Sequence, residues 1–417
     1  MLYAHGITFP THILYADDIM IFCTGTERNI LCLLNIFHDY SNVSGKIVNN
    51  SKSRFFTGAM TNSHVQMLVG MFGFSVCIIL FSYLRFPIFK GKPKAAYFIS
   101  ITDIIKAKLA TWKGTALSIM GHIQLVKSII HGMLVYLFHV YMWPRRLLSL
   151  VDSWIRNFIW SGDIHYRKVC TISWKIMCGS WAAGGLDLKP TLMINDSLML
   201  KLAWELISKD CQWAVLFKHK YFSNRRPILC YIKLPVWSSI KMHISMVTSN
   251  SIWIVGTGEN INIWSDNWLR EPLLDFLLID PVYHARFSET LVDVTEDGRW
   301  NFPASLLLHV TSHLVTVVLP SSPPADSFTW QHSSDGKLSA KQAKKNLTIV
   351  APALHWPDLI WRSCIPPSHA FIFWRLFQGK MPTDENVVLE VVSLSLFVIF
   401  VRKLMNLLCF CSSNVHL

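Results

Sequence analysis

The sequence predicts an α+β protein in which a short β-hairpin precedes a mostly helical chain. Residues 11–22, THILYADDIMIF, hold two apolar runs on either side of a polar break, a pattern typical of two strands joined by a tight turn. Residues 27–40 then repeat apolar side chains at helical spacing, and two further helical patterns lie within 97–140. The chain from 145 to 245 also looks mainly helical and is rich in Trp.

The break in the hairpin carries two adjacent acids, Asp17 and Asp18, after Ala16. Two neighbouring carboxylates repel each other unless they share a cation, and Mg²⁺, which prefers oxygen ligands, is the usual one. Asp is also a common turn residue, so a pair that simply faces water is the alternative. The Asp-Asp pair taken alone favours that alternative.

The hairpin is followed by a predicted helix and strand. The helix, 27–40, gathers apolar residues on one face, namely Ile30, Leu33, Leu34 and Phe37. The stretch 44–56, SGKIVNNSKSRFF, reads as a polar turn that leads into a strand. Together with the hairpin, these elements form the first predicted structural segment.

Residues 65–84 are long enough to span a bilayer, because these 20 residues contain no charged side chain. They also contain Gln66, Gly70, Gly73 and two serines, which favour a buried core segment over a membrane helix. A second apolar stretch, 391–401, is too short to span. We therefore expect no stable membrane association.

The helical patterns within 97–140 combine an apolar face with a basic one. Ile101, Ile104, Ile105 and Leu109 form the apolar face. The candidates for contacts with nucleic-acid phosphates are Lys106, Lys108, Lys113, His122 and Lys127. Long basic side chains on an amphipathic helix are often only its solvated face, and this interpretation stays open.

The overall charge favours an anionic partner. Lys and Arg number 39 against 26 Asp and Glu, which gives a formal net charge of +13 and a pI near 9.3. Nucleic acid or an acidic membrane surface fits such an excess. The ten cysteines show no evident disulfide framework, and the start, MLYAHGITFP, lacks the features of a signal peptide, so we expect an intracellular protein.

Three features of the second half have a structural interpretation. Trp253, Trp264 and Trp268 could stack on bases, but residues of this kind more often pack the core of a small hairpin. The stretch GTGEN at 256–260 lacks the Lys-Ser or Lys-Thr that completes a nucleoside triphosphate loop. SSPPADS, at 321–327, is the clearest predicted linker.

Tyr15-Ala16-Asp17-Asp18 within an apolar hairpin resembles the YADD box of reverse transcriptases. Further segments follow in the order expected for the polymerase of plant LINE-type (non-LTR) retrotransposons, and as an ordered set they are highly specific. These segments are FHDYSNVSGKIVNNSKS (37–53), YLRFPIFKGKPKAAYF (83–98), LATWKGTALSIMGHIQLVKSIIHGM (109–133), NFIWSGD (157–163), WIVGTGENINIWSDNWL (253–269), FTWQHSSDGKLSAKQA (328–343) and IWRSCIPPSHAFIFWRLFQGKMPTDENV (360–387). The resemblance covers nearly the whole chain to about Val388.

The resemblance implies RNA-directed DNA synthesis, with RNA and DNA as partners, dNTP as substrate and the nucleus or cytoplasm as location. It makes Asp17 and Asp18 the catalytic, Mg²⁺-binding residues, and Tyr15 and Lys52 the nucleotide-binding ones. In the family a further aspartate on an upstream strand completes the metal site. Only 16 residues precede Asp17, so we expect an incomplete site and an inactive fragment. A non-catalytic nucleic-acid-binding remnant and, more remotely, a membrane-associated protein are the alternatives.

The resemblance also divides the chain. The predicted segments are the end of a palm at 1–80, a helical thumb-like region at 81–145, a helical, Trp-rich connection region at 146–320, the start of the family's zinc-binding region at 328–388, and a tail at 389–417.

The tail lacks the Cys-x-x-Cys expected after the MPTDENV segment. Phe-Val recurs there at an interval of three residues, at 397 and 400. A TTT codon followed by a Val codon contains TGT, a Cys codon, in a shifted reading frame. We therefore predict a frameshifted tail. It retains Cys409 and Cys411 only, and two thiolates do not complete a tetrahedral zinc site, so we expect no zinc in this chain.

Overall fold

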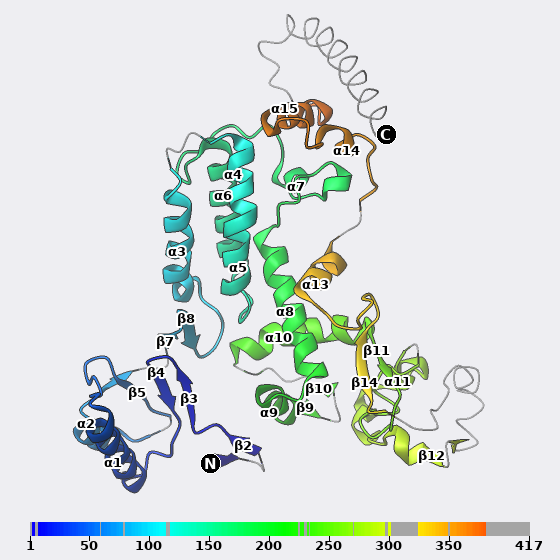
Figure 1. Ribbon diagram of the computed structural model, residues 1–417. Coiled ribbons are helices and arrows are strands. Elements are labelled where there is room, and N and C mark those ends of the chain that lie inside the picture. Colours follow the sequence, from blue (N-terminus) through cyan, green and yellow to red (C-terminus); the bar gives the residue numbers. More distant parts are fainter. Residues whose placement is uncertain are drawn as a thin grey trace, which may run out of the picture. The chain divides into compact units, whose positions relative to one another are not determined.

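The computed structural model shows a mixed α and β chain with many helices and small sheets, which confirms the predicted α+β class (Figure 1). Every sheet among the described residues has two strands. The described residues are 2–4, 7–58, 60–77, 80–113, 117–223, 226–228, 232, 234–269, 271–296, 299–301, 324–348 and 351–380.

The chain divides into two compact units, each built from separate stretches of sequence. Unit 1 comprises Met1–Asp103, Val135–Leu147 and Leu192–Thr348. Unit 2 comprises Ile104–Leu134, Leu148–Thr191 and Ile349–Leu417. The five segments predicted from the resemblance follow the chain order and stay a prediction.

Unit 1 begins with two antiparallel hairpins and a small β-α-β arrangement. Strands β1 (Leu2–Ala4) and β2 (Ile7–Phe9) pair with each other, as do β3 (His12–Tyr15) and β4 (Asp18–Ile21). Helix α1 (Glu27–Ser44) extends four residues beyond the predicted helix. The parallel strands β5 (Arg54–Phe56) and β6 (Ser75–Cys77) are joined by α2 (Asn62–Phe72). Burial of Ile30, Leu68 and Phe72 holds α1 against α2.

The uncharged stretch 65–84 is not one helix. Helix α2 ends at Gly73, whose φ of 65° is a left-handed conformation that favours glycine, and β6 and β7 (Leu80–Tyr83) follow. Leu68 and Phe72 are buried in the small core, as the prediction of a core segment requires. Among the described residues, no helix is both long and apolar enough to cross a membrane.

The remaining elements of unit 1 surround a larger core of aromatic and aliphatic residues. Trp237 in α10 (Pro235–Ser249) is 1% exposed, and Trp330 in β14 (Ser327–Trp330) is equally buried. Strand β14 pairs with β11 (Ser251–Ile254). The other elements assigned mainly to this unit are β8 (Phe86–Phe89), η1 (Ala95–Phe98), α8 (Thr191–Ser208), α9 (Gln212–Tyr221), β9 (Phe222–Ser223), β10 (Arg226–Pro227), α11 (Leu273–Phe276), η4 (Pro281–Arg286), η5 (Leu291–Val294), β12 (Thr295–Glu296), β13 (Arg299–Trp300) and α13 (Ala340–Leu347).

Two predictions about the second half of unit 1 can be compared with the structure. Trp268 is buried and Trp253 and Trp264 pack against the same small core, so the prediction that they serve packing is confirmed. The predicted linker, 321–327, is described from residue 324 onward. The Asp326 carboxylate accepts hydrogen bonds from the backbone N–H groups of Gly256, Gly258 and Asn260 at 2.8–2.9 Å. These N–H groups of the GTGEN loop therefore bind an acid of the chain itself.

Unit 2 is mainly helical. Helix α3 (Ile99–Ala110) lies beside α6 (Arg145–Ser161), with the Trp112 and Phe158 rings 5.9 Å apart (Figure 1). A second helical column consists of α4 (Ile119–Leu125), the π-helical turn η2 (Val126–Ile130) and α5 (His131–Leu137). The predicted break between the two helical patterns falls at Trp112-Lys113, as expected.

The last described segment of the chain packs on a glycine loop of unit 2. This loop contains α7 (Trp174–Met177) and η3 (Trp181–Ala183), and the segment contains α14 (Pro357–Ile360) and α15 (Pro367–Phe377). The Trp374 indole and the Gln378 amide both donate to the carbonyl oxygen of Gly184, at 2.7 and 2.9 Å. This contact joins positions that lie 190 residues apart in the sequence.

Candidate functional site

The aspartate hairpin of unit 1 has the predicted geometry. Tyr15 pairs with Asp18, so Ala16 and Asp17 form a two-residue turn between β3 and β4. Ala16 has a φ of 48°, a left-handed conformation that costs an L-residue about 1–2 kcal/mol. Asp17 and Asp18 are exposed, and so is Tyr15, at 60% of its surface. The hairpin therefore presents both carboxylates and the phenol ring to solvent.

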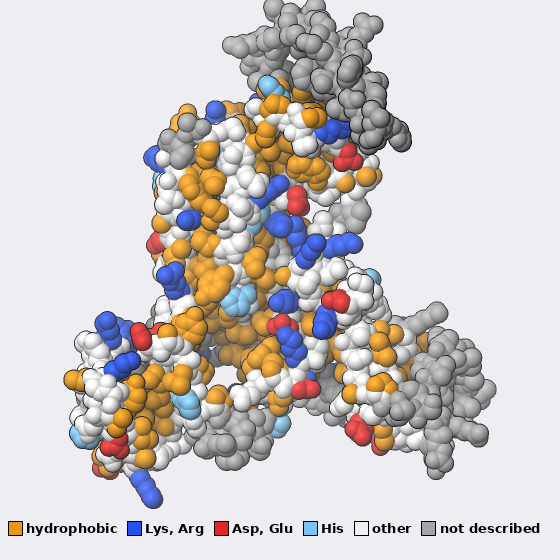
Figure 2. All heavy atoms as spheres, viewed as in Figure 1, with side chains coloured by type: hydrophobic (Ala, Val, Ile, Leu, Met, Phe, Trp, Pro, Cys, Tyr) orange, Lys and Arg blue, Asp and Glu red, His pale blue; other side chains and the backbone are white. Residues whose placement is uncertain are grey.

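The strands of this hairpin also expose apolar side chains on both faces. Neighbouring residues of a strand point to opposite faces, and Ile13 and Leu14 are 41% and 62% exposed. Ile19 in β4 is 57% exposed. Hydrophobic side chains are visible on the surface of this N-terminal part, at the lower left of Figure 2. Within the part of the chain that the structure describes, the sheet of this hairpin consists of β3 and β4.

The residues predicted to bind Mg²⁺ do not form a complete metal site in the described part of the chain. No group of three or more His, Cys, Asp or Glu side chains that could hold a metal ion occurs there. Mg²⁺ requires near-octahedral oxygen coordination, and Asp17 with Asp18 supplies only part of it. Cys409 and Cys411 of the predicted tail lie outside the described residues.

Lys52, the predicted nucleotide-binding lysine, lies in the polar turn that precedes β5. Its backbone N–H donates to the carbonyl and to the side-chain oxygen of Asn49, both at 3.2 Å, and its side chain is exposed. The turn thus fixes the backbone of Lys52 and leaves its ammonium group to solvent. Tyr15, Asp17, Asp18 and Lys52 all belong to unit 1.

Positive charge is concentrated in unit 2. Up to Lys380, this unit carries twelve Lys and Arg against four Asp and Glu, which is more than half of the net charge of the chain. Its first stretch, Ile104–Leu134, contains all four predicted phosphate-binding lysines and no acidic residue. Such a distribution attracts polyanions.

Three of the four predicted lysines lie over indole rings. The Nζ atom of Lys106 is 4.7 Å from the centroid of the Trp154 ring, and that of Lys108 is 5.5 Å from the centroid of Trp112. Lys127 Nζ is 5.2 Å from the Trp181 centroid. An ammonium within about 6 Å of an aromatic centroid is attracted by the ring quadrupole. Each of these three ammonium groups therefore has an indole ring beside it.

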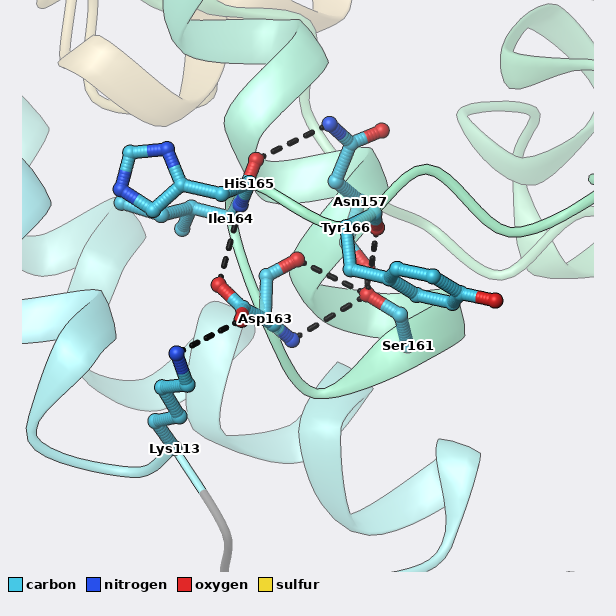
Figure 3. A network of polar contacts seen from close by, with 7 residues as sticks. All are labelled: Lys113, Asn157, Ser161, Asp163, Ile164, His165 and Tyr166. Atoms are coloured by element: carbon cyan, nitrogen blue, oxygen red, sulfur yellow. Dashed lines mark hydrogen bonds and ion pairs between the residues drawn. The ribbon is translucent and has the colours of Figure 1, made fainter.

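Lys113 is held differently, by an acid. Its Nζ atom is 2.9 Å from Asp163 Oδ2, and its side chain is 62% exposed (Figure 3). Asp163 Oδ1 also accepts a hydrogen bond from the His165 N–H at 3.0 Å. This bond, followed by Lys113, lowers the pKa of the Asp163 carboxyl. The charge of Lys113 is thus partly compensated within the chain.

The loop that presents Asp163 is shaped by the end of α6. Gly162, at a φ of 74°, ends the helix, and the Ser161 hydroxyl lies 2.7–2.8 Å from the carbonyl oxygens of Asn157, Asp163 and Tyr166 (Figure 3). The Asn157 amide donates to the Ile164 carbonyl oxygen at 3.0 Å. This network fixes the position of Asp163, and with it that of Lys113.

Lys127 is half-buried. It lies on the π-helical turn η2, and burial lowers the pKa of its ammonium group. The nearby Asp187 acts in the opposite direction, and Lys189 adds to the lowering. His122, by contrast, is 6% exposed, and its Nδ1 lies 3.2 Å from the Ile159 carbonyl oxygen. His122 is therefore a packing residue and does not present itself to a phosphate.

Sequence reasoning missed the aromatic partners of the lysines. Trp112 follows Lys108 by four residues, a spacing that brings side chains together on a helix, so this pair could have been found. Trp154 and Trp181 are distant in the sequence from Lys106 and Lys127, and no sequence signal links them. Asp163 lies in the NFIWSGD segment (157–163), which carries part of the resemblance. Its contact with Lys113, however, depends on the packing of α3 beside α6.

Comparison with known proteins gives one informative similarity. No model of a known protein family matches the sequence. Over 320 residues, which cover 72% of this chain, the sequence is 25% identical to a protein of Arabidopsis thaliana named "Putative ribonuclease H protein". The chain spans 51% of the length of that relative. The chain is thus distantly related to a plant protein named for ribonuclease H.

Proposed function

We propose that this chain is the polymerase-derived part of a plant LINE-type retroelement protein and that it binds RNA and DNA through their phosphates. The observation that carries the proposal is the excess of positive charge in unit 2, where Ile104–Leu134 has four lysines and no acid. The similarity to a plant protein named for ribonuclease H supports a retroelement origin, because a ribonuclease H region follows the polymerase in the family that the sequence resembles. The nucleus or cytoplasm is the location that this function requires.

The aspartate hairpin supports the polymerase part of the proposal. Strand synthesis requires carboxylates that hold two divalent ions, which activate the primer hydroxyl and stabilise the leaving pyrophosphate. Asp17 and Asp18 are exposed at the tip of a hairpin, as such a role demands, and Tyr15 and Lys52 are exposed and available to a dNTP. RNA-directed DNA synthesis is thus the ancestral activity that we assign to unit 1.

Nucleic-acid binding without catalysis is the second candidate function. The observation that favours it is that Asp17 and Asp18 are joined by no third metal-binding side chain among the described residues. The four lysines of unit 2 do not depend on that site. The chain can therefore bind nucleic acid even if it does not synthesise DNA.

A binding titration tests the proposal. Labelled RNA and DNA oligonucleotides of two unrelated sequences are titrated with the full chain at salt concentrations from about 50 to 200 mM, and the affinity is followed by fluorescence anisotropy. We expect affinity to fall steeply with salt and to differ little between sequences, because released counterions provide the driving force. Affinity that stays flat over this range would contradict a phosphate-binding surface.

A matched pair of variants tests whether affinity depends on these particular lysines or on the net charge of the chain. The test variant replaces Lys106, Lys108, Lys113 and Lys127 by Ala. The control removes the same charge from unit 1 through Ala at Lys337, Lys341, Lys344 and Lys345. We expect the test variant to lose most of the affinity and the control to lose little, whereas equal losses would show that only the total charge matters.

A further inference from the structure

An apolar cavity of about 330 Å³ lies in unit 1, and none of its lining residues belongs to the sites described above. Three stretches of the chain form its walls: the turn after β8 (91–93), the segment before α6 (142–144) and residues of 232–242. Mostly apolar cavities of about 300–1,000 Å³ are typical of small-molecule sites, and one of about 150 Å³ already holds benzene. This cavity is therefore large enough for one nucleobase.

The walls of the cavity are fixed by the fold. The Met142 N–H donates to Ser239 Oγ at 2.9 Å, and the Trp143 N–H donates to Asn195 Oδ1 at 2.8 Å. In the turn after β8, Gly91 has a φ of 95°, a conformation that favours glycine. The cavity is thus shaped before a ligand arrives, and this lowers the entropic cost of binding.

The side chains that line the cavity favour contact with a flat ring. Pro93 and Pro144 contribute rigid apolar rings, and Met142 and Met242 contribute flexible thioethers. A thioether contacts an aromatic ring favourably, and Met is common at surfaces that bind varied partners. Such walls recognise the shape of a base and not its edge, in keeping with binding that differs little between sequences.

The surroundings of the cavity are basic. Lys92 lines it, Lys90 and Lys94 lie on either side in the sequence, and all three residues are exposed. Asp196 Oδ1 lies 3.8 Å from Nε2 of the buried His243 in α10, and neither residue lines the cavity. No Asp or Glu occurs in the parts of the sequence that contain the walls, 40–102, 135–147 and 232–249. The cavity therefore suits an apolar ring that carries negative charge beside it.

We propose that this cavity binds one unpaired base of a nucleic-acid strand, while Lys90, Lys92 and Lys94 contact the phosphates beside that base. The proposal rests on the proposed binding function and adds a contact to a base. A base inside a duplex is paired and stacked, so the ligand must be a single strand. A fatty acid also combines an apolar part with a charge, but a cavity about twice the size that holds benzene is short for its chain.

Two strands of equal length test the proposal with the full chain. One is a short single-stranded DNA, and the other has abasic sites throughout, so both present the same phosphates. The affinity of each strand is measured by fluorescence anisotropy. We expect the strand with bases to bind about three- to tenfold more tightly, because one base leaves water for apolar walls.

Variants of the cavity show whether the base binds there. Ser238→Phe places a ring in the cavity, whereas Ser245→Phe places the same ring at an exposed position of α10 that does not line it. We expect Ser238→Phe to abolish the preference for the strand with bases and to leave the affinity for the abasic strand unchanged. Ser245→Phe should retain the preference. A residue that serves stability alone would not distinguish the two strands.

A second pair of variants adds no bulk, in case Ser238→Phe does not fold. Met242→Ala removes a thioether from the cavity at a position that is 63% exposed. Met246→Ala removes the same side chain one turn further along α10, where it does not line the cavity. We expect Met242→Ala to reduce the preference about two- to threefold and Met246→Ala to retain it. Thermal unfolding of each variant ensures that folded proteins are compared.

The phosphate contact has its own test. Lys92→Ala should weaken binding of both strands by the same factor and reduce the salt slope by up to about 0.7, because both strands present the same phosphates. Lys46→Ala, at an exposed position of the same unit that does not line the cavity, should have a smaller effect. A loss confined to the strand with bases would contradict the phosphate contact.

The outcomes separate the proposal from the function on which it rests. If both strands bind equally, or if the preference survives in Ser238→Phe and Met242→Ala, no base occupies the cavity and the proposal is wrong, while the phosphate-binding function stands. If the chain binds neither strand, the proposed function is overturned, and the cavity proposal with it. Saturable binding of decanoate that Ser238→Phe abolishes, without any preference for bases, would assign the cavity to a fatty acid and overturn the proposal.

Discussion

Asp152 is a carboxylate whose environment opposes its charge. It lies on α6 in unit 2, and its Oδ1 accepts the N–H of Thr191, the first residue of α8, at 3.0 Å. Burial raises the pKa of this carboxyl to about 6, although the hydrogen bond from Thr191 acts in the opposite direction. Folding therefore places an acid where its neutral form is favoured over most of the acidic range.

The raised pKa of Asp152 predicts how the free energy of unfolding changes with pH. Between pH of about 4 and 6 the folded state binds this proton more tightly than the unfolded chain, so the free energy of unfolding should fall as the pH rises through that window. Asp152→Asn keeps an oxygen acceptor for Thr191 without the charge. We expect it to raise the free energy of unfolding at pH 7 by on the order of 1–2 kcal/mol, with allowance for partial exposure, and to have little effect below pH 4.

Urea unfolding at several pH values measures this effect. Asp358→Asn, an exposed position of the same unit, serves as the control and should not change the pH profile. A loss of stability in Asp152→Asn at pH 7 would mean that a negative charge at the start of α8 is worth more than the burial of that charge costs.

At the scale of elements, the docking of the last described segment on the glycine loop depends on one backbone position. Gly184 has a φ of 74°, and a Cβ atom placed there would lie 2.7 Å from Cζ2 of Trp356 and 3.0 Å from Cδ1 of Leu354. Both the conformation and the space therefore require glycine. The carbonyl oxygen of the same residue accepts the two hydrogen bonds from α15 and its end.

Gly184→Ala should destabilise unit 2 by about 2–4 kcal/mol, since it combines left-handed backbone strain with overpacking against two side chains. Gly45→Ala is the matched control, because Gly45 has a φ of 67° and nothing within 4 Å of the added methyl group. The control should lose only about 1 kcal/mol. Equal losses in chemical unfolding of the two variants would show that the segment yields to the methyl group.

Elements with a local sequence signal were predicted well from sequence, and contacts between distant elements were not. The hairpin, α1 and the helices on either side of Trp112 follow from apolar periodicity and turn residues, which act over a few positions. The hydrogen bonds from the GTGEN loop to Asp326 depend on the pairing of β11 with β14, about 70 residues apart. Periodicity carries no information about such pairs, so the hydrogen bonds of Asp326, within the predicted linker 321–327, could not be predicted.

At the scale of the whole molecule, the two candidate sites belong to different compact units. The aspartate hairpin and Lys52 belong to unit 1, and the lysines over indole rings belong to unit 2. The residues of the hairpin site and Lys52 were predicted from the resemblance, and the lysines of unit 2 from the basic helical pattern; their catalytic and binding roles stay predictions. What the structure adds is their local setting: exposed carboxylates at a strained turn, and ammonium groups beside indole rings.

The assignment of the two sites to different units predicts how the chain behaves in a primer-extension assay. With a primed RNA template, dNTPs and Mg²⁺ or Mn²⁺, we expect the 417-residue chain alone to extend no primer while it still binds the template. The physical reason is that Asp17 and Asp18 are the only pair offered at the hairpin, and two-metal catalysis requires further oxygen ligands that no cluster among the described residues supplies. Template-dependent incorporation that disappears in Asp17→Ala would refute this expectation. It would also show that residues outside the described ranges complete the site. Because Asp17→Ala leaves the lysines of unit 2 unchanged, we expect that variant still to bind the template.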